Sequence, residues 1–323
     1  MFRQLSRHKK KVFGLLGGGG LAASYYYYTN NTTTNSLPPL NSSLQPNTSL
    51  VCELIEKETV SDDTCRFRFA LPTPNHLLGL HLPTSDKFAS SHIVAHDDAM
   101  IARAYTPISM FYTKGYFDLL IKRYDGGEFS TQFHDKMKLG STMQFRGPVM
   151  TLPNLPSNKY KTVLMICGGT GITPMYQIIR NILFIKKNEK LKLVLLYANR
   201  SDILLKQELD LLQSKYPNRL QVQYVLEEKK GKNNSSNNIL FGKRIDLALL
   251  RKFIPTDTDS STAILVCGPN GMLSSLCGNY RSNNRNRQPQ LGGLLHTAVA
   301  DIDSNNNQDV FMLSDVGVVQ FKS

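Results

Sequence analysis

The sequence has few cysteines and histidines, and none at a spacing that binds a metal or builds a disulfide framework. His92 and His96 are four residues apart, but no third ligand accompanies them, and we interpret them as part of a solvated loop. The cysteines are odd in number and lack close pairing; they are Cys52, Cys65, Cys167, Cys267 and Cys277. This composition excludes a disulfide-stapled domain and a metal centre, and it indicates a largely reduced protein.

Acidic residues are missing from the first 52 positions, and no charged residue or histidine occurs between Val12 and Cys52. The chain begins instead with a basic stretch that contains Arg3, Arg7, Lys9, Lys10 and Lys11. Residues 12–28 form an apolar, glycine-rich run of 17 residues that ends in four tyrosines, close to the lower limit of about 17 residues for spanning a bilayer. We expect residues 1–28 to be a basic targeting segment and membrane anchor, with a cleaved presequence or an interfacial helix as alternatives.

The chemistry of this N-terminal region also suggests a location. A basic N-terminus without acidic residues is typical of mitochondrial import signals. The positive-inside tendency would keep the basic end in the matrix and send the body across the inner membrane. We therefore expect the mitochondrial inner membrane, with the body facing the intermembrane space, and the outer membrane as the alternative. Residues 29–50, rich in Thr, Asn, Ser and Pro, are expected to be a polar tether.

The chain carries a formal net charge of +13, of which the five basic N-terminal residues supply five, leaving +8 on the rest. A positive surface favours an acidic partner or an anionic membrane surface. Nucleic acid is the other usual partner of a basic protein, but the sequence has no helix-turn-helix, finger spacing or aromatic-basic repeat. We therefore expect no nucleic-acid partner.

A chain of 323 residues, 41% of them hydrophobic, is long enough for two domains. Residues 51–150 contain short alternating runs between glycine and proline turns, which predict an antiparallel, Greek-key β-barrel; the runs are Cys65–Leu71, Tyr116–Tyr124 and Thr142–Phe145. Residues 151–159, which include two prolines, are expected to be a linker. Over residues 160–323, strand and helix patterns alternate, which predicts a parallel sheet with crossover helices and an extended C-terminal tail.

Two glycine clusters in the second half indicate a nucleotide site. Gly168–Met175 follows one hydrophobic run, Thr162–Cys167. Cys267–Met272 follows another, which begins at Thr262. Each run is typical of a buried parallel strand, and the glycines after it permit a tight turn into a helix whose N–H groups attract phosphate. Both turns should therefore meet at the carboxyl edge of one sheet.

The barrel half carries groups suited to a flavin. Arg103, Tyr105 and Thr106 lie close together on one extended segment. A guanidinium pairs with a pyrophosphate through two hydrogen bonds, a tyrosine ring stacks on a flavin, and a threonine hydroxyl can hydrogen-bond the redox-active ring nitrogen. The glycine turn and hydroxyls of Gly126–Thr131 offer a second phosphate cradle. By themselves these residues are also compatible with an ordinary edge strand and turn.

Taken in order, these clusters resemble the ferredoxin-NADP reductase superfamily, in its NADH-cytochrome b5 reductase branch. The resemblance covers about residues 51–278 and rests on six motifs in the family's order: Arg103-x-Tyr-Thr-Pro107, Gly126-Gly-x-x-Ser130, Arg146-Gly-Pro148, Gly168–Met175, Tyr197-Ala-Asn199 with Asp202–Leu205, and Cys267-Gly-Pro269. It implies FAD on the barrel, NADH or NADPH on the sheet domain, and single electrons leaving to a haem protein.

The resemblance also implies roles for individual residues. On this basis the FAD contacts would be Arg103 on the pyrophosphate, Tyr105 along the isoalloxazine and Thr106 on its ring nitrogen, completed by Lys122, Gly127, Ser130 and Thr131. The nucleotide contacts would be Gly169, Thr170, Gly171 and Pro174, with Cys267, Gly268, Pro269 and Met272 beside the nicotinamide. Thr106 and Cys267 are then the catalytic candidates. Asp202 resembles an acidic residue that favours an unphosphorylated ribose, but Arg200 nearby could accept a 2′-phosphate, so the choice between NADH and NADPH stays open.

The N-terminal region, the tether and the tail after Met272 are similar to fungal mitochondrial flavoproteins that assist cytochrome c import and haem attachment alongside the haem lyase. This resemblance implies a membrane-anchored FAD enzyme that passes electrons from NADH or NADPH to haem iron, with the haem lyase and apocytochrome c as its acceptor complex. One alternative is an NADH-cytochrome b5 reductase, because the basic surface suits an acidic b5-type haem protein. Another is a flavin-binding assembly factor that turns over no nucleotide.

Overall fold

The computed structural model describes residues 42–44, 49–80, 87–96, 102–156, 159–184, 190–228, 238–255, 261–278, 290–300, 308–314 and 317–321. The predicted targeting segment and anchor, and most of the predicted tether, lie outside these residues. No helix within the described ranges is both long enough and apolar enough to cross a membrane. The chain from Pro38 onward forms one unit, which contains both predicted domains.

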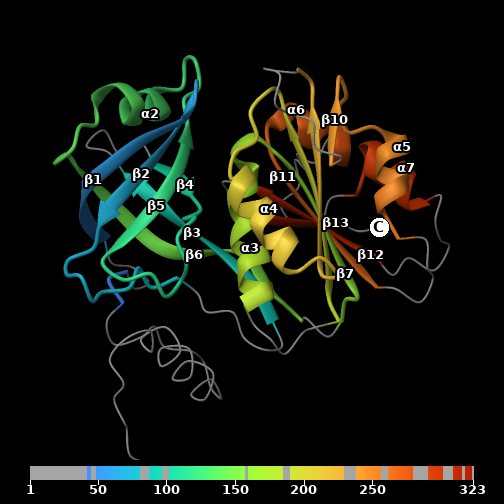
Figure 1. The fold of residues 1–323 in the computed structure, drawn as a ribbon, viewed down its shortest axis with the longest axis horizontal. Coiled ribbons are helices and arrows are strands. Elements are labelled where there is room, and N and C mark those ends of the chain that lie inside the picture. The colour runs from blue at the N-terminus through green and yellow to red at the C-terminus, as the bar shows by residue number, and fades with distance from the viewer. Residues whose placement is uncertain are drawn as a thin grey trace, which may run out of the picture. The chain divides into compact units, whose positions relative to one another are not determined.

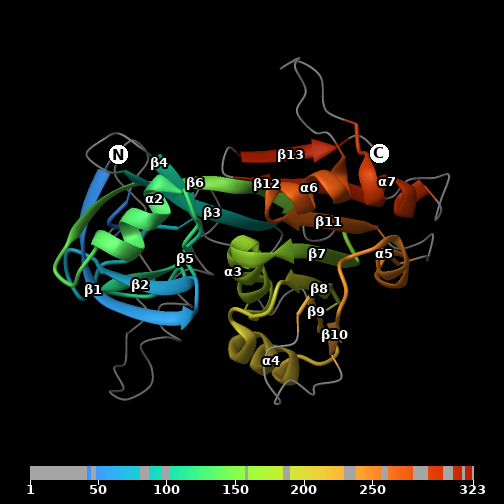
Figure 2. The same cartoon turned by 90° about the horizontal axis from the view of Figure 1, so that it is seen from above.

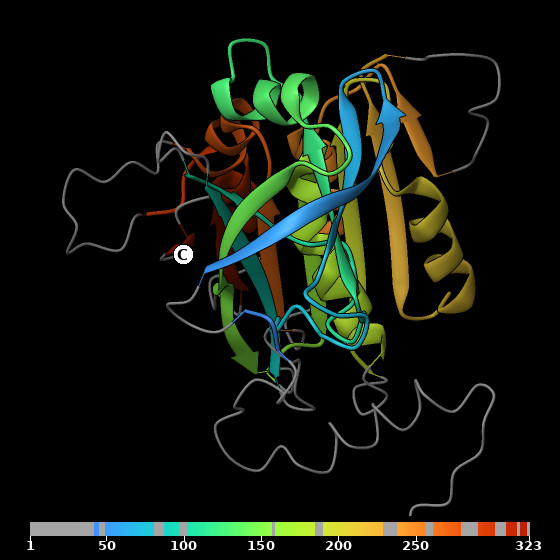
Figure 3. The same cartoon turned by 90° about the vertical axis from the view of Figure 1, so that its left-hand side faces the viewer.

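The first half of this unit is an antiparallel sheet of six strands. They are β1 (Ser49–Ser61), β2 (Thr64–Ala70), β3 (Lys87–His96), β4 (Ala102–Tyr105), β5 (Tyr116–Lys122) and β6 (Thr142–Pro156), in the order β4-β3-β6-β1-β2-β5 (Figure 1). Just beyond β4, the Ile108 N–H donates to the Asp118 carbonyl of β5 at 2.9 Å, which ties the two edges of the sheet together. The predicted antiparallel sheet is therefore confirmed. Figure 3 shows the molecule with this half facing the viewer and helix α2 (Glu128–Thr131) at one end of it. Helix α2 continues into the π-helical turn η1 (Gln132–Lys136).

Alternation along β2 explains why this segment folds as a strand. Phe67 and Phe69 are fully buried in a core that also contains Phe117, Phe133 and Phe145, whereas Arg66 and Arg68 lie on the other face. The Arg68 guanidinium forks onto the Asp118 carboxylate, with Nε to Oδ1 at 2.7 Å and Nη2 to Oδ2 at 2.9 Å. The period of two thus places an aromatic core on one side of β2 and an ion-pair network on the other.

Two features of this half differ from the sequence-based expectations. His92 and His96 lie on β3, which pairs with β4 on one side and β6 on the other, so their interpretation as part of a solvated loop was wrong. Strand β6 continues to Pro156, so residues 151–156 of the expected linker are strand. Beyond Arg146, β6 pairs only with β3 among the described strands, and a strand paired on one side tolerates proline.

The second half is a sheet of seven strands, and its predicted parallel character is confirmed. The strands are β7 (Thr162–Gly168), β8 (Lys192–Asn199), β9 (Leu220–Leu226), β10 (Ile239–Phe241), β11 (Thr262–Cys267), β12 (Gln308–Ser314) and β13 (Gly317–Phe321). Their order is β10-β9-β8-β7-β11-β12-β13, and only the β12–β13 pair within it is antiparallel. The expected C-terminal tail thus supplies two strands to the sheet.

Helices cover both faces of this sheet. On the face that β7 turns toward the barrel lie α3 (Ile172–Phe184) and α4 (Lys206–Lys215), and on the opposite face lie α5 (Leu247–Phe253), α6 (Asn270–Cys277) and α7 (Gly293–Ala300) (Figure 2). Helix α3 is sandwiched between barrel and sheet, and eleven of its 13 residues are buried. Burial on both sides explains why its sequence is apolar almost all round.

The order of strands creates a switch point in the middle of the sheet. From β7 the chain builds outward through β8, β9 and β10, then returns to the other side of β7 with β11. Ligands of open α/β sheets bind at the carboxyl ends of the strands where the order reverses in this way. The two glycine clusters follow β7 and β11, the two strands on either side of that point.

Candidate functional site

The two glycine turns lie against each other at the switch point. Strands β7 and β11 pair in parallel up to Cys167 and Cys267. After β7 the chain forms a 3-10 turn, η2 (Gly169–Gly171), before α3 begins. A Cβ atom on Gly171 would lie only 2.4 Å from the Cys267 carbonyl oxygen, and one on Gly268 would lie 3.1 Å from the Gly168 nitrogen. The expected meeting of the two turns is confirmed, and glycine is required because backbone packs on backbone.

The predicted nicotinamide-side residues border this contact. Pro269 precedes the first turn of α6, and Met272 lies within it. The Met272 sulfur would be 2.6 Å from a Cβ on Gly168. Cys267 ends β11 and is half-buried. Of the predicted nucleotide residues, Gly169, Thr170, Gly171, Pro174, Cys267, Gly268, Pro269 and Met272 are thus all brought to one edge of the sheet.

Two side chains at the end of β8 hold the glycine turn through hydrogen bonds. The Tyr197 hydroxyl donates to the Gly169 carbonyl at 3.1 Å and accepts from the Asn199 amide at 3.0 Å. Burial raises the pKa of Tyr197 well above its usual value, so the hydroxyl keeps its proton. The Thr173 hydroxyl donates to the Thr170 carbonyl at 3.1 Å. Tyr197 and Asn199 belong to one of the six motifs but were not among the predicted site residues; the signal for their role was a polar pair at the end of a buried strand.

On the barrel, the predicted flavin residues follow one another along β4. Arg103 is exposed and its guanidinium donates to the Ala102 carbonyl at 2.8 Å. Tyr105 is half-buried, and its ring centroid lies 6.4 Å from that of Phe129 and 5.7 Å from that of Phe133. Thr106 follows directly. The segment therefore presents a surface cation, a ring held by core aromatics and a hydroxyl in succession.

The loop before α2 is shaped by its own hydroxyl groups. The Ser130 hydroxyl accepts from the Tyr124 N–H and donates to the Gly127 carbonyl, both at 3.1 Å. The Thr131 hydroxyl also donates to the Gly127 carbonyl, at 3.0 Å. Gly126 has a φ of +73°, and a Cβ on Gly127 would lie 2.7 Å from the Ser130 oxygen. These contacts preform the loop, which fits a ligand held by backbone N–H groups.

The barrel loop and the glycine turn approach each other at Tyr124. Its hydroxyl lies 3.5 Å from the Thr170 hydroxyl, although Tyr124 belongs to the barrel and Thr170 to the sheet half. Tyr124 was not among the predicted site residues; its position between Lys122 and Gly126 was the available signal. The contact brings the predicted phosphate loops of both halves to one place.

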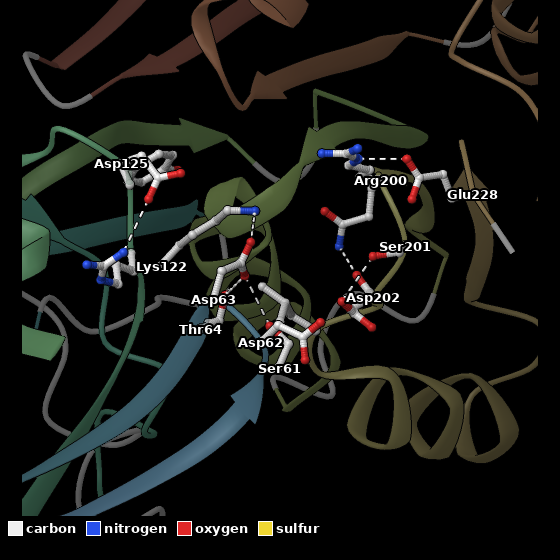
Figure 4. Close-up of a pocket in the computed structure, with 14 residues that line it drawn as sticks. Ser61, Asp62, Asp63, Thr64, Lys122, Asp125, Arg200, Ser201, Asp202 and Glu228 are labelled. Atoms are coloured by element: carbon white, nitrogen blue, oxygen red, sulfur yellow. Dashed lines mark hydrogen bonds and ion pairs between the residues drawn. The ribbon is translucent and has the colours of Figure 1, made fainter. Parts of the chain in front are cut away.

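A cavity of about 670 Å³ extends from this region (Figure 4). Its lining comes from the β1–β2 turn, the end of β5 and the loop after it, and the segments that end β8 and follow β9: Ser61–Thr64, Lys122–Asp125, Asn199–Asp202, Leu204 and Glu228. Lys122, predicted as an FAD contact, therefore shares a cavity with Asp202, predicted as a nucleotide contact. Thr106 and Cys267, the catalytic candidates, are not part of this lining.

Carboxylates outnumber cations around the cavity. Asp62, Asp63, Asp125, Asp202 and Glu228 line it, against Lys122, Arg123 and Arg200. Each of the three cations faces a lining carboxylate: Lys122 and Asp63 are 2.7 Å apart, Arg123 and Asp125 3.2 Å, and Arg200 and Glu228 2.7 Å. The hydrogen bond that the Arg200 Nε–H donates to the Glu228 carboxylate raises the pKa of Arg200 above its usual value. Arg200, the side chain that could accept a 2′-phosphate, is thus paired with a carboxylate.

All five cysteines lie among the described residues, and none forms a disulfide. Burial raises the pKa of Cys52 and of Cys277 to about 12, and raises that of Cys167 well above its usual value. These three thiols are therefore protonated at neutral pH. Cys267 differs from the other four in being only half-buried, at the edge where the two glycine turns meet.

Comparison with known proteins agrees with this geometry. Residues 51–153 match the oxidoreductase FAD-binding domain family, and residues 165–278 match the oxidoreductase NAD-binding domain family. The chain is 39% identical over 250 residues to NADH-cytochrome b5 reductase 2 of Neurospora crassa, covering 76% of this chain and 69% of the relative. It is 35% identical over 261 residues to human NADH-cytochrome b5 reductase 1, covering 72% of this chain and 81% of the relative. The cytochrome b5 reductase domain of Ulva prolifera nitrate reductase superposes with a TM-score of 0.62 at 26% identity, covering 83% of this chain and 99% of that domain.

Fold and site together define a two-domain oxidoreductase, with an FAD-binding domain on an antiparallel sheet and an NAD-binding domain on a parallel sheet. The chain belongs to the NADH-cytochrome b5 reductase family.

Proposed function

We propose that this chain uses FAD to carry electrons from NADH to a haem protein. The observation that carries the proposal is the approach of the two binding halves, in which the Tyr124 hydroxyl of the barrel lies 3.5 Å from Thr170 of the glycine turn. Bound FAD supplies the chemistry that side chains lack, because it accepts a hydride and releases single electrons. The protein's own contribution is to hold donor and acceptor together and to exclude water.

On the barrel, Arg103 binds the FAD pyrophosphate, since its guanidinium is exposed and lies on the same strand as Tyr105. Tyr105 flanks the isoalloxazine, and Thr106 hydrogen-bonds its ring nitrogen. Gly127, Ser130 and Thr131 form the preformed loop that holds phosphate through backbone N–H groups. Lys122 faces the cavity shared with the nucleotide.

On the sheet, the N–H groups of the Gly169-Thr170-Gly171 turn bind the pyrophosphate of NADH at the start of α3, and Pro174, which has no N–H, shapes the first turn of the helix. Cys267, Gly268, Pro269 and Met272 line the approach of the nicotinamide. Asp202 takes the ribose hydroxyls in the cavity. NADH is preferred over NADPH because the carboxylates around the cavity repel a 2′-phosphate and Glu228 occupies Arg200.

For the acceptor, we favour a b5-type haem protein, after the names of the relatives and the net positive charge of the chain. A second candidate is haem iron held by the haem lyase with apocytochrome c, at the inner mitochondrial membrane facing the intermembrane space. The basic, acid-free N-terminus supports this second candidate. The C-terminal tail does not support the second candidate, because part of this tail forms strands β12 and β13 of the sheet.

Anaerobic reduction tests the electron path. NADH added to the purified yellow protein without oxygen should bleach the flavin absorbance in one turnover, and NADPH should do so more slowly. Dithionite serves as the control that the bound flavin can be reduced at all. A flavin that dithionite bleaches and neither nucleotide reduces would contradict the proposal and favour a non-catalytic assembly factor.

The same reduced protein distinguishes the acceptors. It is mixed with cytochrome b5 in one experiment and with haem bound to the haem lyase and apocytochrome c in another, and the rates of haem reduction are compared. Faster reduction of cytochrome b5 is the expected result. Faster reduction of the lyase-bound haem would assign the chain to haem attachment instead.

A further inference from the structure

Helix α3 makes polar contacts with the barrel that are buried from solvent. The Gln177 side chain accepts from the Ser90 hydroxyl at 3.0 Å and from the Ser91 N–H at 2.8 Å, through the same oxygen. Its amide nitrogen donates to the Ser91 carbonyl at 3.3 Å and to the Pro107 carbonyl at 3.4 Å. Gln177, Ser90 and Ser91 are all buried. One side chain of the sheet half thus joins two segments of the barrel.

One turn further along α3, Arg180 adds a second contact. Its guanidinium donates to the Ile108 carbonyl at 2.6 Å. Ile108 belongs to the barrel, but its side chain is buried in the hydrophobic cluster of the sheet half, which also contains the apolar residues of α3. The segment Pro107–Ile108 is therefore held by α3 through two carbonyl groups and one apolar side chain.

Helix α3 and the segment Pro107–Ile108 each adjoin one of the two proposed binding sites. Helix α3 begins directly after Gly171, and Gln177 lies about 9 Å further along its axis at 1.5 Å per residue. The held segment directly follows Tyr105 and Thr106. Helix α3 is thus a short, rigid connection between the nucleotide turn and the segment assigned to the flavin.

We propose that Gln177 and Arg180 are positioning residues that fix the nucleotide turn relative to the flavin segment for hydride transfer. The inference rests on the proposed function. Apolar packing between the halves is non-directional and permits sliding, whereas buried hydrogen bonds specify one register because a shifted helix leaves them unmade. Reactions between two bound groups are sensitive to such shifts, and a displacement of about 1 Å can slow the reaction about 100-fold.

Gln177→Leu and Arg180→Met remove the polar contacts and keep most of the side-chain volume. The reduction of bound flavin by saturating NADH is measured in a single turnover, where the rate constant does not depend on the folded fraction. We expect it to fall about 10- to 100-fold in each variant, with FAD occupancy and reduction by dithionite unchanged. Arg180→Lys, which retains a donor for the Ile108 carbonyl, should recover much of the rate.

A matched control lies within the sheet half. Gln213 on α4 accepts from the Val222 N–H at 2.6 Å, a contact that does not involve the barrel. Gln213→Leu should lower the midpoint of thermal unfolding without slowing flavin reduction. In the FAD-free protein, hydrogen exchange at the Ser91 amide, which donates to the Gln177 side chain, should accelerate in Gln177→Leu and not in Gln213→Leu.

Two results would overturn the inference. One is a Gln177→Leu variant that loses stability like the control but reduces its flavin at the wild-type rate. The other is a variant whose NADH affinity falls while the limiting rate is unchanged, which would assign Gln177 to nucleotide binding. Failure of the proposed function is separate, because it appears as a wild-type flavin that NADH does not reduce.

Discussion

The barrel and the sheet build their halves of the site in opposite ways. The barrel offers side chains on a strand that the core already fixes, with Arg103 exposed and Tyr105 packed against Phe129 and Phe133. The sheet offers backbone, and its turn at Gly171 exists only because no side chain separates it from the Cys267 carbonyl. The exposed Arg103 can therefore be altered with little effect on the fold, whereas a side chain at Gly171 displaces the turn from β11.

The difference fits the two ligands. Under the proposed function, FAD is held by charge and aromatic contact, which long side chains provide. Under the same proposal, the nicotinamide nucleotide binds at a turn whose N–H groups need no rearrangement. Substitutions in each half test whether the two halves differ in this way.

The largest effect is expected at Gly171. Gly171→Ala places a Cβ 2.4 Å from a backbone carbonyl, so the turn must shift away from β11. We expect the rate of flavin reduction by NADH to fall about 100-fold, while FAD stays bound to the barrel. The measurement is anaerobic reduction together with the flavin-to-protein ratio.

Gly271→Ala is the control for this change. Gly271 lies on α6, and a Cβ there would meet nothing within 4 Å. Alanine should leave the reduction rate unchanged and stabilise the helix by less than the ~1 kcal/mol that separates alanine from glycine in a helix interior, because Gly271 is the second residue of α6. If the two alanine variants reduced their flavin at the same rate, the close contact at Gly171 would not matter for flavin reduction.

Arg103→Ala should have the second largest effect, and it should fall on the other half of the site. Loss of a charged hydrogen-bonding group weakens binding by about 1.5–3 kcal/mol, so FAD should bind about 10- to 100-fold less tightly. The thermal midpoint of the FAD-free protein should be unchanged, because the Arg103 side chain is exposed. Titration of the FAD-free protein with FAD measures the affinity.

Arg103→Lys should bind FAD with intermediate affinity, because lysine keeps the positive charge but cannot donate the paired hydrogen bonds of a guanidinium. Arg244→Ala removes another exposed arginine, one paired with Glu227 at 2.9 Å, and should not change FAD binding. Full FAD affinity in Arg103→Ala would refute the assignment of this residue.

Glu228→Gln should have the smallest effect. It releases Arg200 from an exposed ion pair, and such pairs contribute up to about 1 kcal/mol. The ratio of kcat/KM for NADPH to that for NADH should rise about two- to fivefold. Steady-state rates with both nucleotides measure it.

Glu227→Gln is the matched control, because Glu227 pairs with Arg244 and does not line the cavity. Its NADPH-to-NADH ratio should equal that of the wild type. An equal rise in both variants would indicate general charge repulsion instead of a role for Glu228 through Arg200.

Local patterns predicted most of the elements because they act over a few residues. The run Thr162–Cys167, interpreted as a buried parallel strand, forms β7 (Thr162–Gly168). After β8, helix α4 does not begin until Lys206. Leu205 has a left-handed φ of 57°, and the Asn199 side chain holds the Asp202 carbonyl, so the chain turns before the helix begins.

The two domains, their order and the two glycine turns could be predicted from the sequence, because hydrophobic period and glycine conformation are local properties. Three features depend instead on the tertiary structure: strands β12 and β13 complete the sheet, Glu228 pairs with Arg200, and Gln177 binds Ser91. Gln177 and Ser91 are 86 positions apart in the chain. Such contacts leave no local signal, because they depend on how the barrel and the sheet pack against α3.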